Sequence, residues 1–437
     1  MSTEKADIVI IGAGLIGLSS AYHVKNQNPD LDVLVIEKEK TYSQGNTGRS
    51  TAGFRDMFST RVNFMLSHSS IEFYRHVQKD LGHNIDMKYI GYMFLMSRKK
   101  VETLEALDNL SKLTRIDIIE QDRLAEISQL NLKLDETESR VLGLDPIEVG
   151  VLGRNCGILE IELLSSFYYE QCVKLGVRFK FQSEVKSLEV SPQEPLEYPG
   201  EPFLWQKKRI RSIITDVGEI KADRFIITTG AWTKQLLDPL GIDSHMRPKR
   251  RDVFQTSGED IRNFVHSSYE FLNDESVFPF TVLPSHGIYL RPYPKNGSFW
   301  VSTSGTTSDQ EVGPHFSYDP NDRIEYTVPS GILFENHIAP ILKAYLKPYS
   351  NFKVSGSWTG YYSLNTQDKT PYIFPALNAI IATGGSGAGV MKADALGRIV
   401  SGILTGEEAV SLYDGSRIET DILGVSNRNV GIESLRF

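Results

Sequence analysis

A glycine-rich turn near the amino terminus has the residue types and spacing of a site for nucleotide phosphates. Gly12, Gly14 and Gly17 directly follow an apolar run at residues 7–11. The first glycine permits a tight turn, the second lets a pyrophosphate approach the backbone, and the third lets the next helix pack closely on the strand. The free N–H groups at the start of that helix would bind the phosphates. A glycine-rich turn that binds nothing is the alternative interpretation.

The sequence on both sides of this turn predicts the strands and the helix that must position it. Residues 7–11 are predicted to form a buried strand, residues 18–25 a helix, and residues 33–36 a second buried strand. Glu37 stands at the carboxyl end of the second strand, where an acidic side chain accepts hydrogen bonds from ribose hydroxyls. This order favours a dinucleotide site over an empty turn, but it does not choose between NAD and FAD.

A second strand, glycine loop and helix follow much later in the chain. Residues 379–383 are predicted to be a buried strand, 384–389 a glycine-rich loop, and 390–404 a helix with one apolar face. The loop would let a flat ring approach the backbone, and the helix amides would attract partial negative charge. Taken alone, the loop is explained equally well as a flexible turn. Between the two units, residues 176–185 and 222–232 are predicted strands, the latter ending in a glycine turn, and residues 193–200 a loop.

Composition and length exclude several classes of protein. A chain of 437 residues is too long for one core, so two domains are expected. A net charge of -8 argues against nucleic-acid binding, and nine scattered histidines without ligand spacing argue against a metal site. Two cysteines, no signal peptide and no long apolar run indicate a cytoplasmic protein without a transmembrane segment, at most peripherally bound to the inner face of the membrane.

These motifs together resemble the D-amino-acid oxidase / sarcosine oxidase superfamily of FAD-dependent oxidoreductases over nearly the whole chain. The landmarks are residues 12–17 with Glu37, 45–55, 229–232, 366–371 and 386–389. Within the superfamily, the chain looks most like the archaeal dye-linked L-proline dehydrogenases. That similarity is carried by residues 48–50, 247–249, 297–300 and 387–392.

The resemblance implies an α/β fold, α+β overall, with a glutathione-reductase-like FAD-binding domain of Rossmann type and a smaller substrate domain built on an antiparallel sheet. The FAD-binding domain is expected to be discontinuous and to comprise residues 1–85, 150–240 and 346–420. The substrate domain is expected to comprise residues 86–149 and 241–345, with 421–437 as a C-terminal tail. Its candidate strands are residues 88–95, 288–291 and 298–302.

The resemblance also implies which residues bind FAD. They are Gly12, Gly14, Ile16, Gly17, Glu37, Lys38, Gly48, Arg49, Ser50, Val185, Gly230, Trp232, Gly387, Gly389, Met391 and Lys392. Relatives that tether the flavin covalently use a cysteine shortly before the Asp368 segment or a histidine after the first motif. Here Tyr361 stands near the first position and residues 47–53 contain no histidine, so we expect noncovalent FAD.

An amino-acid substrate needs a fixed cation for its carboxylate and an apolar wall for the rest. The candidate catalytic residues are Arg55, Lys392, Tyr289, Arg291 and Tyr361, with Arg49 as a further cation and Tyr362 and Trp358 as further wall residues. Sarcosine oxidases carry their substrate lysine where Met391 stands, one residue before Lys392, and such an offset turns a helical side chain by about 100°. For each arginine, the alternative is that it forms an ordinary surface or structural ion pair. Residues 249–251 are predicted to be a solvated charge run.

The expected activity is oxidation of an amino acid or secondary amine, with L-proline the best single candidate and hydride transfer to flavin N5. The electron acceptor is left open among a quinone, a dye-like acceptor and oxygen. One alternative is a 2-hydroxy acid or glycerol-3-phosphate dehydrogenase of the same superfamily. Another is a flavin-bearing subunit of a larger dehydrogenase complex.

Overall fold

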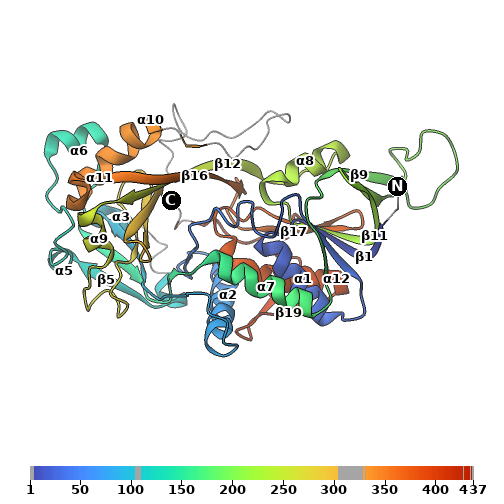
Figure 1. The fold of residues 1–437 in the computed structure, drawn as a ribbon, viewed down its shortest axis with the longest axis horizontal. Coiled ribbons are helices and arrows are strands. Elements are labelled where there is room, and N and C mark those ends of the chain that lie inside the picture. Colours follow the sequence, from blue (N-terminus) through green and yellow to red (C-terminus); the bar gives the residue numbers. More distant parts are fainter. Residues whose placement is uncertain are drawn as a thin grey trace.

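Two large sheets lie next to each other along the long axis of the molecule (Figure 1). The structure, a computed structural model, describes residues 4–103, 110–303, 328–329, 331–426, 428–433 and 435. Residues 104–109, 304–327 and 330 of the predicted substrate domain, and parts of the predicted tail, lie outside the described residues. The expected mixed α/β architecture is confirmed.

The first sheet has a parallel centre, in the order β17-β18-β11-β1-β2-β8. β8, β2, β1, β11 and β18 pair in parallel, and β17 closes one edge antiparallel to β18. β10 pairs antiparallel with both β11 and β9. The strands are β1 (Glu4–Ile11), β2 (Val33–Ile36), β8 (Arg178–Lys180), β9 (Val185–Pro192), β10 (Lys208–Thr215), β11 (Gly218–Ile227), β17 (Tyr372–Ala376) and β18 (Ala379–Thr383).

Helices cover this sheet because its central strands are apolar on both faces, as in other parallel sheets. The helices of this half are α1 (Leu15–Gln27), α2 (Arg61–Lys79), α7 (Ile161–Lys174), α8 (Thr233–Leu237) and α12 (Ala393–Thr405), with short 3-10 turns η1 (Gly230–Trp232) and η6 (Val390–Lys392). α1 packs against α7 and α12. The approach to α12 is close, because a Cβ on Gly397 would overlap Ser19. The helices after the two glycine loops therefore form one layer.

The second sheet has the order β16-β12-β15-β14-β13-β4-β6-β5 and is antiparallel except for the parallel pair β13 and β4. Its strands are β4 (Tyr92–Met96), β5 (Ile116–Glu120), β6 (Val149–Gly153), β12 (Arg247–Ser257), β13 (Phe280–Val282), β14 (Ile288–Tyr293), β15 (Ser298–Thr303) and β16 (Lys353–Leu364). The remaining helices are α3 (Arg98–Thr103), α5 (Gln121–Leu124), α6 (Glu136–Leu142), α9 (Glu259–Val265), α10 (Gly331–Leu333), the π-turn η4 (Phe334–Ile338) and α11 (Ala339–Tyr345), with 3-10 turns η2 (Asp238–Leu240) and η5 (Lys347–Ser350). Short pairs β3 (Gly53–Phe54) with β7 (Gly157–Ile158) and β19 (Ala409–Ser411) with β20 (Arg417–Glu419) complete the fold.

Two segments belong to a different sheet from the one that the sequence suggested. β6 and β16 are strands of the second sheet, although residues 150–240 and 346–420 were assigned to the FAD-binding domain. β16 pairs along its length with β12. We therefore propose a domain division that follows the sheets, with β6 and β16 in the substrate domain.

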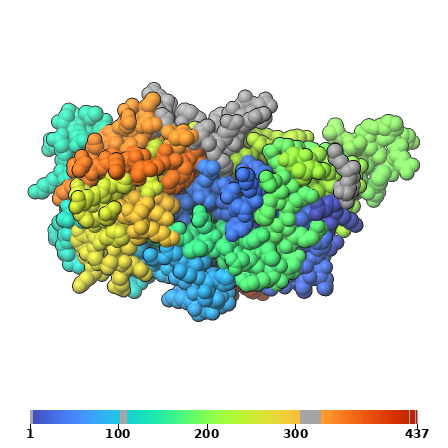
Figure 2. All heavy atoms as spheres, in the orientation of Figure 1, coloured from blue at the N-terminus to red at the C-terminus, as the bar shows by residue number. Residues whose placement is uncertain are grey.

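Three local predictions have different outcomes. The predicted strand at 176–185 is wrong as one element, because β8 ends at Lys180 and β9 begins at Val185. The predicted loop at 193–200 is confirmed and is part of a lobe that projects from one end of the molecule (Figure 2). The predicted solvated charge run at 249–251 is wrong, because Lys249 and Arg251 are buried on β12, which lies between β16 and β15.

The described residues contain no helix long and apolar enough to cross a membrane. They also contain no group of three or more His, Cys, Asp or Glu side chains that could hold a metal ion. Cys156 and Cys172 are buried and free.

Candidate cofactor and substrate site

The first glycine turn has the close packing that its sequence requires. Gly12 has a φ of +102°, in the region that favours glycine. A Cβ on Gly17 would overlap the Gly12 carbonyl oxygen and lie 2.7 Å from the Thr228 hydroxyl. That hydroxyl donates to the carbonyls of Ile11 and Gly12, at 2.9 and 3.0 Å. The end of β11 therefore fixes the turn between β1 and α1.

Glu37 closes the same turn from the end of β2. Its Oε2 accepts a hydrogen bond from the Ala13 amide at 2.8 Å, and its Oε1 accepts one from the Glu39 amide at 3.1 Å. Burial raises the pKa of this carboxyl, and the two amide hydrogen bonds oppose that shift. Each oxygen can accept a further hydrogen bond, so the side chain fits the predicted role of ribose acceptor.

A cavity opens at this carboxyl edge of the parallel sheet. Ligands of open parallel sheets bind at this edge. Seven predicted FAD-binding residues line the cavity: Gly12, Gly14, Glu37, Lys38, Val185, Gly230 and Trp232. Other lining residues were not among the predicted FAD-binding residues; they include Asn46, Thr47, Ser183, Glu184, Thr228, Thr229 and Gln235. The Lys38 ammonium lies 3.9 Å from the centroid of the Trp232 ring, so these two side chains form one wall.

Gly14 lies beside Thr47, and both residues line this cavity. A Cβ on Gly14 would lie 3.1 Å from the Thr47 hydroxyl oxygen, which accepts a hydrogen bond from the Leu15 amide at 3.1 Å. Gly14 is also the N-terminal cap of α1 and offers no side chain there. This open approach to a helix N-terminus is what a pyrophosphate needs.

The second glycine loop contacts both the first motif and the second sheet. A Cβ on Gly389 would lie 3.8 Å from Ile16 Cδ1, so the two glycine units are neighbours. Gly387 has a φ of +84°, and a Cβ there would lie 2.6 Å from the Tyr362 ring. Tyr362 in turn hydrogen-bonds Tyr289 on β14. The loop therefore lies where the nucleotide-binding sheet and the tyrosines of the second sheet meet.

The segment around Arg49 is held against β16. The amide of Tyr361 donates to Asn46 Oδ1 at 2.7 Å, and the indole of Trp358 donates to the Arg49 carbonyl at 3.0 Å. Arg49 donates back to the Thr359 carbonyl at 3.3 Å. Tyr361 and Trp358 thus support the loop that carries Arg49. Gly48 in the same loop is exposed, and Ser50 Oγ accepts from the Ala52 amide.

Lys392 is buried at the start of α12, with 1% of its surface exposed. Its Nζ donates to Asn63 Oδ1 at 2.6 Å and lies 4.3 Å from the centroid of the Phe58 ring. Burial lowers the pKa of this amine to about 7. Met391, the preceding residue, packs into the core of the nucleotide-binding half. A proton on Lys392 is therefore easily gained or lost near neutral pH.

Arg55 lies on the same Phe58 ring as Lys392. Its Cζ is 4.2 Å from the ring centroid, and its guanidinium donates to the carbonyls of Met57 and Leu435. Two buried basic side chains thus contact one aromatic ring, and one of them, Lys392, lies in η6 directly after the second glycine loop. A carboxylate placed between them would meet opposite charge in a low-dielectric setting.

Arg291, the third predicted cation, has a different environment. It is 1% exposed and donates to the carbonyls of Thr51, Pro292 and Leu159, at 2.9, 3.1 and 3.1 Å. Its NH2 also lies 3.5 Å from Glu160 Oε1. These bonds tie β14 to segments of the nucleotide-binding half. The geometry favours a structural role over the substrate role suggested by sequence.

Comparison with known proteins places this architecture in a family. Residues 7–403 match the family model described as "DAO: FAD dependent oxidoreductase". The chain belongs to this family of FAD-dependent oxidoreductases. FAD is accordingly its cofactor, and the Cβ-free approach at Gly14, the carboxylate of Glu37 and the cavity beside them fit that group.

The chain is similar to several known proteins over most of its length. The FAD-dependent oxidoreductase domain-containing protein 1 of Xenopus laevis is 25% identical over 92% of this chain and 79% of its own. The monomeric sarcosine oxidase of Bacillus sp. (strain B-0618) is 23% identical over 95% of this chain and 97% of its own. The crystal structure of L-proline dehydrogenase from P. horikoshii has the same fold, with a TM-score of 0.72, 22% identity, and coverage of 94% of this chain and 96% of its own.

Proposed function

We propose that the protein oxidises an amino acid or another carboxylate-bearing amine at its carbon–nitrogen bond, with L-proline the best single candidate. The observation that carries the proposal is the pair of buried basic side chains, Arg55 and Lys392, that both contact the ring of Phe58. The names of similar proteins support the same chemistry, since they include a sarcosine oxidase, a dimethylglycine dehydrogenase and an L-proline dehydrogenase.

The chain's own residues suit three tasks in such a reaction. Arg55 and Lys392 would hold the carboxylate, because two cations beside each other bind it more strongly than either alone. Tyr289 and Tyr362 would cover the reacting carbon and exclude water, since Tyr289 is buried on the second sheet and hydrogen-bonded to Tyr362. Burial would also favour the unprotonated substrate amine, which must have a free electron pair when the hydride leaves. The bound flavin supplies the hydride acceptor, N5.

A dye-reduction screen of the purified protein tests this proposal. The panel is L-proline, sarcosine, D-amino acids, 2-hydroxyglutarate and glycerol 3-phosphate. We expect L-proline to give the highest kcat/KM, and reduction by hydroxy compounds alone would reject amine oxidation. Measuring the same turnover with oxygen, a quinone and a dye identifies the electron acceptor.

A 2-hydroxy acid dehydrogenase is the second candidate function. The human mitochondrial L-2-hydroxyglutarate dehydrogenase is 21% identical over 76% of this chain and 68% of its own. A 2-hydroxy acid offers the same carboxylate to Arg55 and Lys392, so the clamp does not separate the two substrate classes. The third possibility, a flavin-bearing subunit of a larger complex, predicts no turnover of any substrate by the isolated chain.

A further inference from the structure

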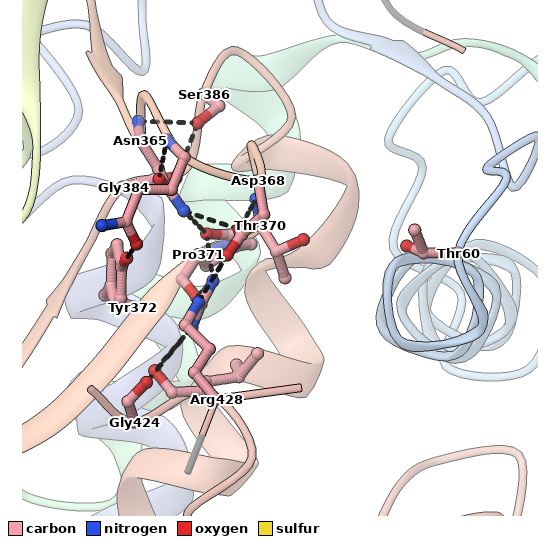
Figure 3. A network of polar contacts seen from close by, with 12 residues as sticks. Thr60, Asn365, Asp368, Thr370, Pro371, Tyr372, Gly384, Ser386, Gly424 and Arg428 are labelled. Atoms are coloured by element: carbon pink, nitrogen blue, oxygen red, sulfur yellow. Dashed lines mark hydrogen bonds and ion pairs between the residues drawn. The ribbon is translucent and has the colours of Figure 1, made fainter. Parts of the chain in front are cut away.

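The C-terminal segment is fastened to the protein by Arg428. Its guanidinium makes a two-pronged contact with Asp368, at 2.7 and 2.8 Å, and donates to the carbonyls of Thr370 and Pro371 (Figure 3). Its Cζ lies 3.9 Å from the centroid of the Tyr372 ring. Burial alone would raise the pKa of Asp368, but the hydrogen bonds from Arg428 and the Thr370 amide hold it below its usual value. This anchor directs the following residues toward the start of α2.

Glu433 then places its carboxylate at the N-terminus of α2, with 3% of its surface exposed. Oε1 accepts from the Ser59 amide at 2.9 Å and from the Ser59 hydroxyl at 2.7 Å. Oε2 accepts from the Thr60 amide at 3.3 Å and from Asn63 Nδ2 at 3.3 Å. Thr60, the N-cap residue of α2, makes no side-chain cap bond of its own. Glu433 therefore supplies the cap from the far end of the chain.

Asn63 connects this carboxylate to Lys392. Its Nδ2 also donates to the hydroxyls of Thr60 and Thr370, both at 2.9 Å, while its Oδ1 accepts from Lys392 Nζ at 2.6 Å. An amide has its two donors and its acceptor on opposite sides. Because acceptors surround Nδ2, Oδ1 must face Lys392.

The same segment also contacts the second cation. The carbonyl of Leu435 accepts a hydrogen bond from Arg55 NH2 at 2.9 Å. The Leu435 side chain packs into the apolar cluster that contains Tyr92, Phe280 and Tyr289. Both cations of the proposed clamp are thus held, directly or through one side chain, by residues 433 and 435.

We infer that Glu433 is a positioning residue of the substrate clamp: it orients Asn63, and through it the ammonium of Lys392, toward the carboxylate of the substrate. The inference rests on the proposed function, since it gives Lys392 a substrate to bind. Glu433 belongs to the C-terminal segment, outside both glycine motifs.

The charges around Lys392 give this role a distinctive signature. Glu433 and Asp368 favour its protonated form, and Arg55 and burial disfavour that form. Removing the charge of Glu433 lowers the pKa of Lys392 further, because one of the two stabilising carboxylates is lost. A purely structural contact would change stability without moving this titration.

The experiment measures binding of pyrrole-2-carboxylate, a planar carboxylate that cannot donate a hydride, through the change in flavin absorbance between pH 5.5 and 9. The FAD-loaded wild type is compared with Glu433→Gln, Glu433→Asp and, as a matched control, Ile432→Ala, whose side chain is 68% exposed. In the wild type, affinity should fall as pH rises through the pKa of Lys392. Hydrogen exchange of the first turn of α2 reports the capping contact independently of ligand binding.

In Glu433→Gln we expect the midpoint of this decline in affinity to move down by about one pH unit. At pH values above the midpoint, the protonated fraction of Lys392 would then be roughly tenfold smaller than in the wild type. Glu433→Asp should retain most of the wild-type midpoint, and Ile432→Ala all of it. Faster exchange in Glu433→Gln with an unchanged midpoint would overturn the positioning role and leave only a helix cap. If the wild-type flavin does not respond to the carboxylate at all, the proposed function fails first, and the inference fails with it.

Discussion

Gly17 lies so close to Gly12 that a Cβ on Gly17 would overlap the Gly12 carbonyl oxygen. A methyl group there must open the turn between β1 and α1, where the phosphate-binding amides lie. We expect Gly17→Ala to lose FAD and to lower the melting temperature. The control is Gly331→Ala, since a Cβ at Gly331 meets only the Glu335 side chain at 3.8 Å. FAD content from absorbance and a thermal melt check both effects, and a fully loaded Gly17→Ala protein would contradict the assignment.

Gly14→Val tests the phosphate approach more selectively. Its ordinary backbone conformation tolerates a side chain, but the added methyl groups would meet Thr47 and occupy the path of the pyrophosphate. We expect a folded protein without FAD. Circular dichroism measures the fold and absorbance the flavin. Retention of FAD at one equivalent would remove Gly14 from the site.

Glu37→Ala should weaken FAD binding without abolishing it. The variant loses a charge-assisted acceptor for the ribose, a contribution of about 1.5–3 kcal/mol. It also leaves the Ala13 amide without its partner. Quenching of flavin fluorescence gives the dissociation constant, with the exposed Glu419→Ala as control. Equal affinities of the two variants would show that Glu37 makes no contact with the cofactor.

The flavin should be released when the protein is precipitated with acid. Tyr361 stands near the position of the tethering cysteine of some relatives, and residues 47–53 contain no histidine. The released flavin should have the mobility of intact FAD in chromatography. Yellow colour that stays in the washed pellet would establish a covalent bond instead.

Substitution of Arg291 should change stability more than substrate binding. Arg291→Met removes the donor to three backbone carbonyls and leaves Glu160 with Lys295 alone, and loss of a buried partner of this kind costs about 3–5 kcal/mol. The control is Arg61→Met at an exposed position. Chemical denaturation measures the difference. A variant of normal stability with a greatly raised KM would return Arg291 to the substrate clamp.

Lys392→Met should remove the pH dependence of carboxylate binding near neutrality. Burial holds the pKa of Lys392 at about 7, below its ordinary value, so in the wild type the cation is present below that pH and is lost above it. Carboxylate affinity should therefore fall with rising pH in the wild type and stay low and flat in the variant. Titration of flavin absorbance at pH 6 and pH 8 distinguishes them. A wild-type decline that survives in Lys392→Met would assign the titration to another group.

The parts of the site that sequence could predict are those whose geometry is local. Gly12, Gly17 and Glu37 are placed by two consecutive strands with one turn and one helix between them, so their spacing alone carries the information. The strand before the second glycine loop was predicted with its bounds, Ala379 to Thr383, for the same reason. For such residues, the order of neighbouring elements along the chain is enough to predict their placement.

The parts that sequence missed depend on contacts between distant segments. Thr228 fixes the first glycine turn, but nothing at the end of β11 distinguishes it from an ordinary strand residue. Asn63 and Glu433 are separated by 370 positions and lie in no motif. Lys249 and Arg251 have the sequence pattern of a solvent-facing charge run. Their burial depends on the position of β12 within the whole sheet, which the local sequence does not indicate.

The placement of Glu433 has a consequence for how the protein is made in the cell. β1, α1 and β2 are synthesised well before β18, α12 and Glu433. Arg55 therefore gains its hydrogen bond to the Leu435 carbonyl only after residue 435 has been synthesised. Lys392 likewise gains its link through Asn63 to Glu433 only after residue 433 has been synthesised. The contacts that hold these two side chains are therefore late steps in folding, and they form after the elements of the first glycine motif are already available.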